Sequence, residues 1–234
     1  MKICILENDI FDAAFESEFK RPADFFLSLF KYVQVDWYFE VFNTKLGEYP
    51  INFEKFDAVI LTGSASDSFS DEPWIVELRK KITELLKTDQ KILGICFGHQ
   101  LIALCLGAQV GRSEKGWGVG RQTYTCHQTV GMQDWGGDEI SLLASHQDQV
   151  KTLPPGAQLL VSNEFCPIAG FQLKKNVLCL QPHPEFIPQY SEYLLNKRRQ
   201  KLGENLYDRA LKSLSLGHEG VRMAKFLVAF VEAA

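Results

Sequence analysis

Short apolar runs alternate with a clear amphipathic segment in the first part of the chain. Runs of about four to eight apolar residues are typical of strands buried on both faces of a sheet. Such runs predict strands at Lys2–Leu6, Val35–Phe42, Ala58–Leu61, Lys91–Ile95, Gln158–Ser162 and Val177–Leu180. The amphipathic segment begins at a cap and a first-turn proline, Asp71-Glu72-Pro73, and predicts a helix. One face of this helix carries Ile75, Leu78, Ile82, Leu85 and Leu86. A strand, helix, strand order predicts an α/β fold with a doubly wound, mostly parallel sheet.

The middle of the chain, Gly116–Phe171, has a different pattern. Val119–Tyr124 and Glu139–Ala144 have the character of shorter, partly exposed strands. Turn signals separate these segments, at Gly136-Gly137 and at Pro154-Pro155-Gly156. We interpret this region as a small antiparallel extension of the same domain.

Helical spacing begins at Ile187 and continues to the end of the chain. We expect the last helix, Val221–Glu232, to cover the sheet with its apolar residues Val221, Phe226, Val228 and Phe230. No internal repeat, low-complexity tract or linker is visible in the sequence. A single domain over residues 1–234 is therefore the simplest prediction.

Composition is that of an ordinary globular protein. The 234 residues are 46% hydrophobic and 23% charged, and this length suffices for one sizeable core. The formal net charge of −4 gives no electrostatic footprint for nucleic acid or an anionic membrane. No apolar run approaches the roughly 18–20 residues that span a bilayer, and the first residues are typical of a strand, not of a signal peptide. We expect a cytoplasmic enzyme or binding domain.

The six cysteines contain no Cys-x-x-Cys pair, which argues against a disulfide framework or a closed zinc site. Cys4, Cys105 and Cys179 lie in apolar runs, where a thiol behaves as a small hydrophobic group. A metal cluster of Cys126, His127 and Cys166 is the weaker alternative, because adjacent ligands chelate poorly. We predict no metal and no cofactor.

Cys96 stands between a predicted buried strand and an apolar helix. Gly94 and Gly98 flank it at i−2 and i+2, which is the spacing of a nucleophile elbow with cysteine in place of serine. Such an elbow exposes the sulfur at the carboxyl edge of the sheet, where α/β folds bind ligands. The helix N-terminus favours thiolate, and its free backbone N–H groups can face a developing oxyanion. The alternative is a structural cysteine buried at the end of a strand.

His183 directly follows another predicted buried strand, and prolines on both sides keep it out of a regular helix. Glu185 lies two residues further on and can accept the imidazole Nδ1–H, as the third member of a catalytic triad does. This spacing recurs by chance, so alone it indicates a surface histidine near an acid. Together with the cysteine elbow it predicts a Cys96, His183, Glu185 triad.

These motifs resemble those of class I glutamine amidotransferases, in order over residues 1–186. The matching segments are Cys96-Phe97-Gly98-His99-Gln100 for Cys-x-Gly-x-Gln, His183-Pro184-Glu185 for His-Pro-Glu, Thr62-Gly63-Ser64 for the oxyanion loop and Ser145-His146-Gln147-Asp148 for a Ser-His-Gly-Asp stretch. The last segment is similar to members of the GMP-synthetase amidotransferase type. The likeness is greatest to stand-alone, GMP-synthase-like members, which include plant γ-glutamyl peptidases, and it implies a flavodoxin-like fold.

The resemblance implies a role for each matched residue. Cys96 would attack the amide carbon of glutamine or of another γ-glutamyl bond, with His183 as general base and then acid and Glu185 orienting His183. Gly63 or Ser64, together with Phe97, would form the oxyanion hole. Substrate would be held by Gln100, Ser145 and His146. Two departures are the replacement of the more usual Gly-Gly-Pro by Thr62-Gly63-Ser64, and of the glycine in Ser-His-Gly-Asp by Gln147.

Further residues have two interpretations each. His99 is three residues past Cys96, so we expect it to pack locally and not to act as the base. His146 is equally a pocket wall or a structural hydrogen-bonding group. Trp117 is either a lid or substrate platform, or an aromatic ring packed on the sheet edge. The basic cluster Lys197-Arg198-Arg199-Gln200-Lys201 predicts a solvated helix face.

The sequence leaves three functions open. The first is a glutaminase or γ-glutamyl hydrolase, which either delivers ammonia to a separate synthetase subunit or cleaves γ-glutamyl peptides by itself. The second is another thiol hydrolase on a similar scaffold, acting for example on esters. The third is a non-catalytic subunit that binds a partner.

Overall fold

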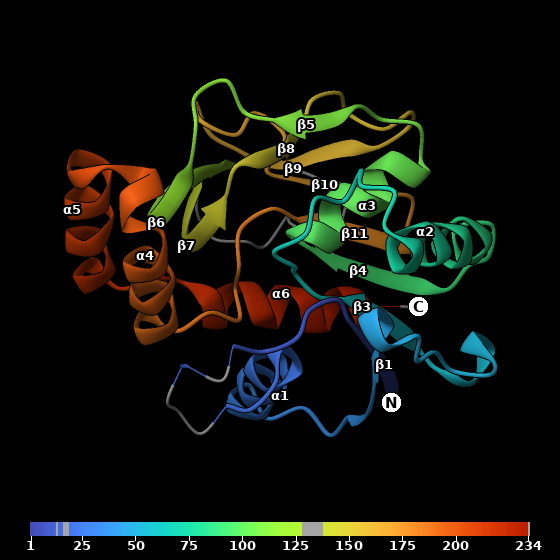
Figure 1. The fold of residues 1–234 in the computed structure, drawn as a ribbon. Coiled ribbons are helices and arrows are strands. Elements are labelled where there is room, and N and C mark those ends of the chain that lie inside the picture. The colour runs from blue at the N-terminus through green and yellow to red at the C-terminus, as the bar shows by residue number, and fades with distance from the viewer. Residues whose placement is uncertain (13, 16–18, 128–137, 234) are drawn as a thin grey trace.

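The computed structural model describes residues 1–12, 14–15, 19–127 and 138–233. Within these residues one mixed sheet of nine strands has the order β2-β1-β3-β4-β11-β10-β9-β6-β7 (Figure 1). The parallel half contains β1 (Lys2–Glu7), β2 (Tyr38–Asn43), β3 (Ala58–Leu61), β4 (Lys91–Ile95) and β11 (Val177–Leu180). The antiparallel half contains β6 (Gly118–Cys126), β7 (Glu139–His146), β9 (Gln158–Ser162) and β10 (Gly170–Leu173). A separate two-stranded ribbon pairs β5 (Val110–Arg112) with β8 (Asp148–Val150).

Helices cover both faces of the parallel half. One face packs on α1 (Pro22–Tyr32) and α6 (Gly220–Glu232), and the other on α2 (Pro73–Leu85) and α3 (Phe97–Cys105). Both faces need cover because successive side chains of β1 point to opposite faces of the sheet and are apolar on each: Ile3 and Ile5 face α1 and α6, while Cys4 and Leu6 face α2 and α3. At the other end, α4 (Pro188–Leu202) and α5 (Glu204–Ser213) pack on β6 and β7 (Figure 1). No helix of the described residues has the length and apolar character needed to cross a membrane.

The predicted α/β fold with an antiparallel extension is confirmed, with shifts at several boundaries. The second strand begins at Tyr38 and not at Val35, because α1 runs to Tyr32 and Gln34 then adopts a positive φ of 62° in the connecting turn. The last helix is present as predicted, and its buried face combines Phe226 and Phe230 with Met223, Ala224, Leu227 and Val231, while Val221 and Val228 are only partly buried. The predicted turn at Gly136-Gly137 lies outside the described residues.

The parallel strands bring separate parts of the chain to one edge. β1, β3, β4 and β11 are neighbours and all end at this edge. The residues that directly follow these strands are Asn8, Thr62, Cys96 and Gln181. The carboxyl edge of a parallel α/β sheet is where such folds bind ligands, so the chemistry of this edge decides the function.

Candidate active site

Cys96 occupies a strained turn between β4 and α3. Its φ of 53° and ψ of −101° are unusual for a residue with a side chain. A Cβ atom at Gly94 would lie 2.8 Å from the backbone of Gly98, and one at Gly98 would lie 2.6 Å from the Leu61 carbonyl oxygen. Both flanking glycines are therefore required by close backbone approach, as the elbow spacing predicts.

The start of α3 provides free donors next to the sulfur. The first backbone bond along α3 joins the Gln100 N–H to the Cys96 carbonyl at 3.0 Å. The N–H groups of Phe97, Gly98 and His99 precede this bond, at the positive end of the helix dipole. The arrangement suits an anion that develops beside Cys96.

His183 is fixed on several sides. Its Nδ1 is 2.7 Å from Glu185 Oε1, and both side chains are buried. The His183 backbone N–H donates to the Leu143 carbonyl at 2.8 Å, which ties the segment after β11 to β7. The Phe186 ring stacks on the imidazole with a centroid distance of 3.7 Å and an interplanar angle of 11°. The imidazole is thus held in one orientation.

The charges around His183 favour its protonated form. Burial by itself lowers the pKa of His183, but the charges of Glu185 and Cys96 and hydrogen bonds to both outweigh burial and raise the pKa to about 10. The imidazole lies between the sulfur and the carboxylate, so a proton on His183 is stabilised from both sides. This environment favours an imidazolium next to the Cys96 side chain.

The Thr62-Gly63-Ser64 segment, which follows β3, lies against both Cys96 and His183. A Cβ atom at Gly63 would lie 2.9 Å from His183 Cε1 and 3.6 Å from Cys96 Cβ. The loop therefore touches both residues, and glycine at this position allows the approach. Gly63 and Ser64 also line the same hollow as Cys96 and His183. The structure thus brings together Cys96, His183 and Glu185 and the residues predicted for the oxyanion hole.

Two hollows meet at Cys96. One, of about 480 Å³, is polar and includes all three predicted substrate residues, Gln100, Ser145 and His146. The other, of about 430 Å³, has aromatic walls formed by Phe25, Phe26, Phe186, Tyr190 and Tyr193. Cys96, Trp117 and Ser145 belong to both hollows.

The polar hollow is built around Asp148. Gln100 Nε2 donates to the Asp148 carbonyl at 2.9 Å, and His146 Nδ1 is 3.1 Å from the same oxygen. Burial lowers the pKa of His146 to about 4, so the ring is neutral near pH 7. His146 therefore combines both expected roles, since it lines the hollow and holds the backbone. Burial, followed by a hydrogen bond with Asp67 and the charge of that residue, raises the pKa of Asp148 to about 6, while Arg112 opposes the rise.

Arg198 departs from the expectation of a fully solvated basic helix face. Its Nη1 donates to Ser145 Oγ at 2.6 Å, and its guanidinium lies over the Trp117 ring, 5.2 Å from the centroid. Arg198 is partly buried and lines both hollows, whereas the other residues of the basic cluster are exposed. The signal that could have revealed it is helical spacing, because Tyr190, Leu194 and Arg198 share one face of α4. Trp117 is a wall of both hollows and packs against this arginine.

His99 packs away from the reacting groups. It is fully buried, its Nδ1 is 3.3 Å from Gln181 Oε1, and its ring contacts Phe171 at a centroid distance of 5.3 Å. Burial lowers the pKa of His99 to about 3. A permanently neutral, enclosed imidazole supports the expected packing role.

The other cysteines differ from Cys96 in their surroundings. None of the six, all within the described residues, forms a disulfide bond; Cys4 and Cys179 are fully buried, and Cys105 is partly buried. Burial raises the pKa of the Cys166 thiol to about 12, which suppresses its reactivity. No group of three or more His, Cys, Asp or Glu side chains within the described ranges is placed to hold a metal ion.

A cysteine on an elbow, beside a histidine–glutamate pair at the carboxyl edge of a parallel sheet, is the arrangement of thiol-dependent hydrolases. Comparison with known proteins agrees: the family description "Glutamine amidotransferase class-I" matches residues 24–199. The chain belongs to this family, which confirms the resemblance of its motifs.

Two relatives show the range of the family. Gamma-glutamyl peptidase 3 of Arabidopsis thaliana is 32% identical over 190 residues, which cover 76% of each chain. One subunit of the glutamine-hydrolyzing GMP synthase of Methanocaldococcus jannaschii is 32% identical over 156 residues, which cover 66% of this chain and 78% of that one. The crystal structure of a glutamine amidotransferase from Thermotoga maritima superimposes with a TM-score of 0.77 at 20% identity, covering 99% and 98% of the two chains. That structure supports the fold.

Proposed function

We propose that this chain cleaves γ-glutamyl amide bonds through a thioester on Cys96. The Cys96 thiolate attacks the γ-carbonyl carbon, and the tetrahedral intermediate collapses when His183 gives its proton to the departing amine. Water then attacks the thioester with His183 as base, which releases the γ-carboxylate and regenerates the thiol. Glu185 holds His183 and stabilises its charge. The Phe97 N–H and the N–H of Gly63 or Ser64 stabilise the oxyanion.

The observation that carries this proposal is the single cluster of three groups from distant parts of the sequence. Glu185 Oε1 lies 2.7 Å from His183 Nδ1, and a Cβ atom at Gly63 would lie 2.9 Å from His183 Cε1 and 3.6 Å from Cys96 Cβ, which places the imidazole and the sulfur side by side. Cys96 and His183 both reach the wall of an open hollow, so a substrate carbonyl can approach the sulfur. A buried structural cysteine would have no need of such a partner.

The shape of the site favours a leaving group larger than ammonia. We infer that the polar hollow takes the γ-glutamyl group and that the aromatic hollow takes the amine. A volume of about 430 Å³ far exceeds that of ammonia, which is close in size to a water molecule of about 30 Å³. Two cations, Arg198 and Lys201, line this hollow and suit the terminal carboxylate of a peptide, whereas Lys197 in the same wall is paired with Asp12. The γ-glutamyl peptidases among the relatives support this choice.

Ammonia delivery to a separate synthetase is the second candidate, because one relative belongs to a GMP synthase. The test is a panel of glutamine, γ-glutamyl dipeptides and simple esters, with ammonia and amine measured separately. Preference for dipeptides supports peptidase function, and preference for glutamine supports ammonia delivery. Cys96→Ala should lose on the order of 10⁶-fold in turnover. Hydrolysis of esters alone, or full activity in Cys96→Ala, would refute γ-glutamyl chemistry at Cys96.

A further inference from the structure

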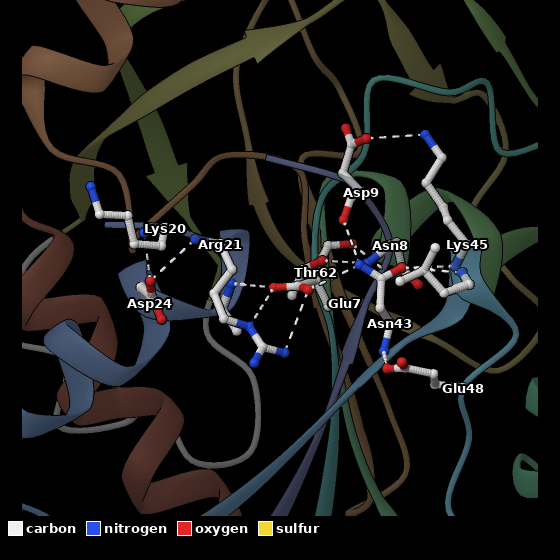
Figure 2. Close-up of polar contacts among 12 residues, drawn as sticks. Glu7, Asn8, Asp9, Lys20, Arg21, Asp24, Asn43, Lys45, Glu48 and Thr62 are labelled. Carbon is white, nitrogen blue, oxygen red and sulfur yellow. Dashed lines mark hydrogen bonds and ion pairs between the residues drawn. The ribbon is translucent and has the colours of Figure 1, made fainter. Parts of the chain in front are cut away.

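The loop that carries Gly63 and Ser64 is tied down by two residues that follow β1. We call Thr62–Ala65 the oxyanion loop, after the role proposed for it. Figure 2 shows Asn8 and Asp9 beside Thr62, together with Asn43 at the end of β2 and Lys45 in the turn after it. These contacts lie next to the proposed chemistry but involve none of Cys96, His183 and Glu185.

Asn8 holds the first residue of the oxyanion loop. The Asn8 backbone N–H donates to Thr62 Oγ1 at 3.0 Å, and Asn8 Nδ2 donates to the Thr62 carbonyl at 2.9 Å. Thr44 Oγ1 donates to Asn8 Oδ1 at 2.9 Å, which fixes the orientation of the amide. Asn8 and Thr44 are fully buried, so these bonds are shielded from water.

Asp9 holds the last residue of the oxyanion loop. Its Oδ2 accepts the Ala65 N–H at 2.7 Å, and its Oδ1 accepts from Lys45 Nζ at 3.0 Å. The Asp9 backbone carbonyl accepts from Asn43 Nδ2 at 3.0 Å. With both ends of the loop bonded to adjacent residues of one segment, the peptide groups of Gly63 and Ser64 between them have little freedom to rotate.

We call Asn8 and Asp9, which hold the two ends of the oxyanion loop, the clamp. Lys45 connects the clamp to the opposite side of the proposed oxyanion hole. Its Nζ lies over the Trp74 ring, 5.4 Å from the centroid. The Trp74 ring stacks on Phe97 at a centroid distance of 5.5 Å and an angle of 24°. Phe97 is the residue whose N–H is the second proposed donor. The same ammonium group therefore contacts both Asp9, which holds the loop, and Trp74, which packs on the elbow helix.

We propose that Asn8 and Asp9 are positioning residues that aim the Gly63 and Ser64 N–H groups at the oxyanion, with Lys45 setting the distance to Phe97. The inference rests on the proposed function, since it needs a tetrahedral intermediate at Cys96. Backbone N–H groups that are already oriented toward the oxyanion position stabilise the transition state more than they stabilise the bound substrate. Loss of the clamp should therefore lower kcat and leave substrate affinity almost unchanged.

The test compares kcat with ground-state binding in Asp9→Ala, Asp9→Asn and Asn8→Ala. We expect kcat on the best γ-glutamyl substrate to fall about 10- to 100-fold in Asp9→Ala, since a displacement near 1 Å can cost about 100-fold. The affinity for the same substrate, measured by calorimetry in the Cys96→Ala background, should change by less than about threefold in Asn8→Ala, because Asn8 lines neither hollow, whereas Asp9 lines the aromatic one. Asp9→Asn keeps an oxygen acceptor for the Ala65 N–H and should retain more activity than Asp9→Ala.

Asp57→Ala is the matched control. Asp57 Oδ2 also accepts a backbone N–H, that of Lys2 at 2.6 Å, but at the opposite end of β1. We expect the kcat of Asp57→Ala to equal that of the unmodified protein. Wild-type kcat in both Asp9→Ala and Asn8→Ala would overturn the inference, as would a loss of affinity in Asn8→Ala as large as its loss of kcat. If one of these two variants does not fold, the kcat of the other decides alone. If neither folds, Thr62→Val decides, because it removes the Oγ1 atom that accepts the Asn8 N–H: an unchanged kcat overturns the inference, and a reduced kcat with unchanged affinity supports it. Failure of the proposed function is a separate result, because it would appear as turnover in Cys96→Ala.

Discussion

A single methyl group at Gly63 tests whether the oxyanion loop, Cys96 and His183 form one unit. A Cβ atom there would be 2.9 Å from His183 Cε1, whereas ordinary contacts begin at 3.4 Å, so the ring or the loop must move by about 0.5 Å to restore an ordinary contact. Phe186 stacks on the imidazole, and Glu185 holds its Nδ1, so the ring cannot retreat without weakening these contacts. The φ of Gly63 is not in the left-handed region, so alanine brings contact and no backbone strain.

We expect Gly63→Ala to lower kcat about 10- to 100-fold, because displacements of this size misalign base and nucleophile. The assay is steady-state hydrolysis of the best γ-glutamyl substrate, with a melting temperature for each protein. Gly111→Ala is the matched control, since its methyl group would meet nothing within 4 Å. Activity of Gly63→Ala within about threefold of Gly111→Ala would refute the packing on which this magnitude depends.

Three further predictions concern charge and titration. Glu185→Gln removes the carboxylate that raises the pKa of His183, so kcat should fall about 10³- to 10⁴-fold, with the pH–rate profile shifted to lower pH; an unshifted profile would contradict the assigned pairing. Arg198→Met should reduce kcat/KM about 10-fold more for γ-glutamyl peptides than for glutamine, and equal losses would remove Arg198 from leaving-group recognition. The pKa of His99, lowered by burial to about 3, lies below its unfolded value, so its stabilising contribution is present above about pH 6.5 and is lost as the pH falls. His99→Gln should therefore lose less free energy of unfolding than the unmodified protein between about pH 7 and pH 4.5, measured by urea titration, and an identical loss would contradict a neutral buried imidazole.

Local sequence carried much of the information on the fold and the candidate site. The elbow around Cys96 is readable because a close backbone approach demands glycine at Gly94 and Gly98. The position of His183 is readable because it ends a buried apolar run. Each of these features spans only a few residues, and over so short a distance the spacing in the sequence determines the local backbone geometry.

The surrounding groups depend on contacts that local spacing does not encode. Asn8 and Asp9 acquire their partners because β1 lies between β2 and β3 in the sheet. Arg198 belongs to a run of charges that is otherwise solvated, and only the packing of α4 against β7 turns it toward Ser145. The predicted start of β2 was wrong because apolar Val35 belongs to the turn after α1 and not to the strand.

The most direct test of the account is detection of the γ-glutamyl thioester. A rapidly quenched reaction with a γ-glutamyl dipeptide, digested at low pH and analysed by mass spectrometry, should show a γ-glutamyl adduct on the peptide that contains Cys96. The adduct should be absent in Cys96→Ala. Turnover by the unmodified protein with no adduct on Cys96, or equal turnover by Cys96→Ala, would contradict the central claim.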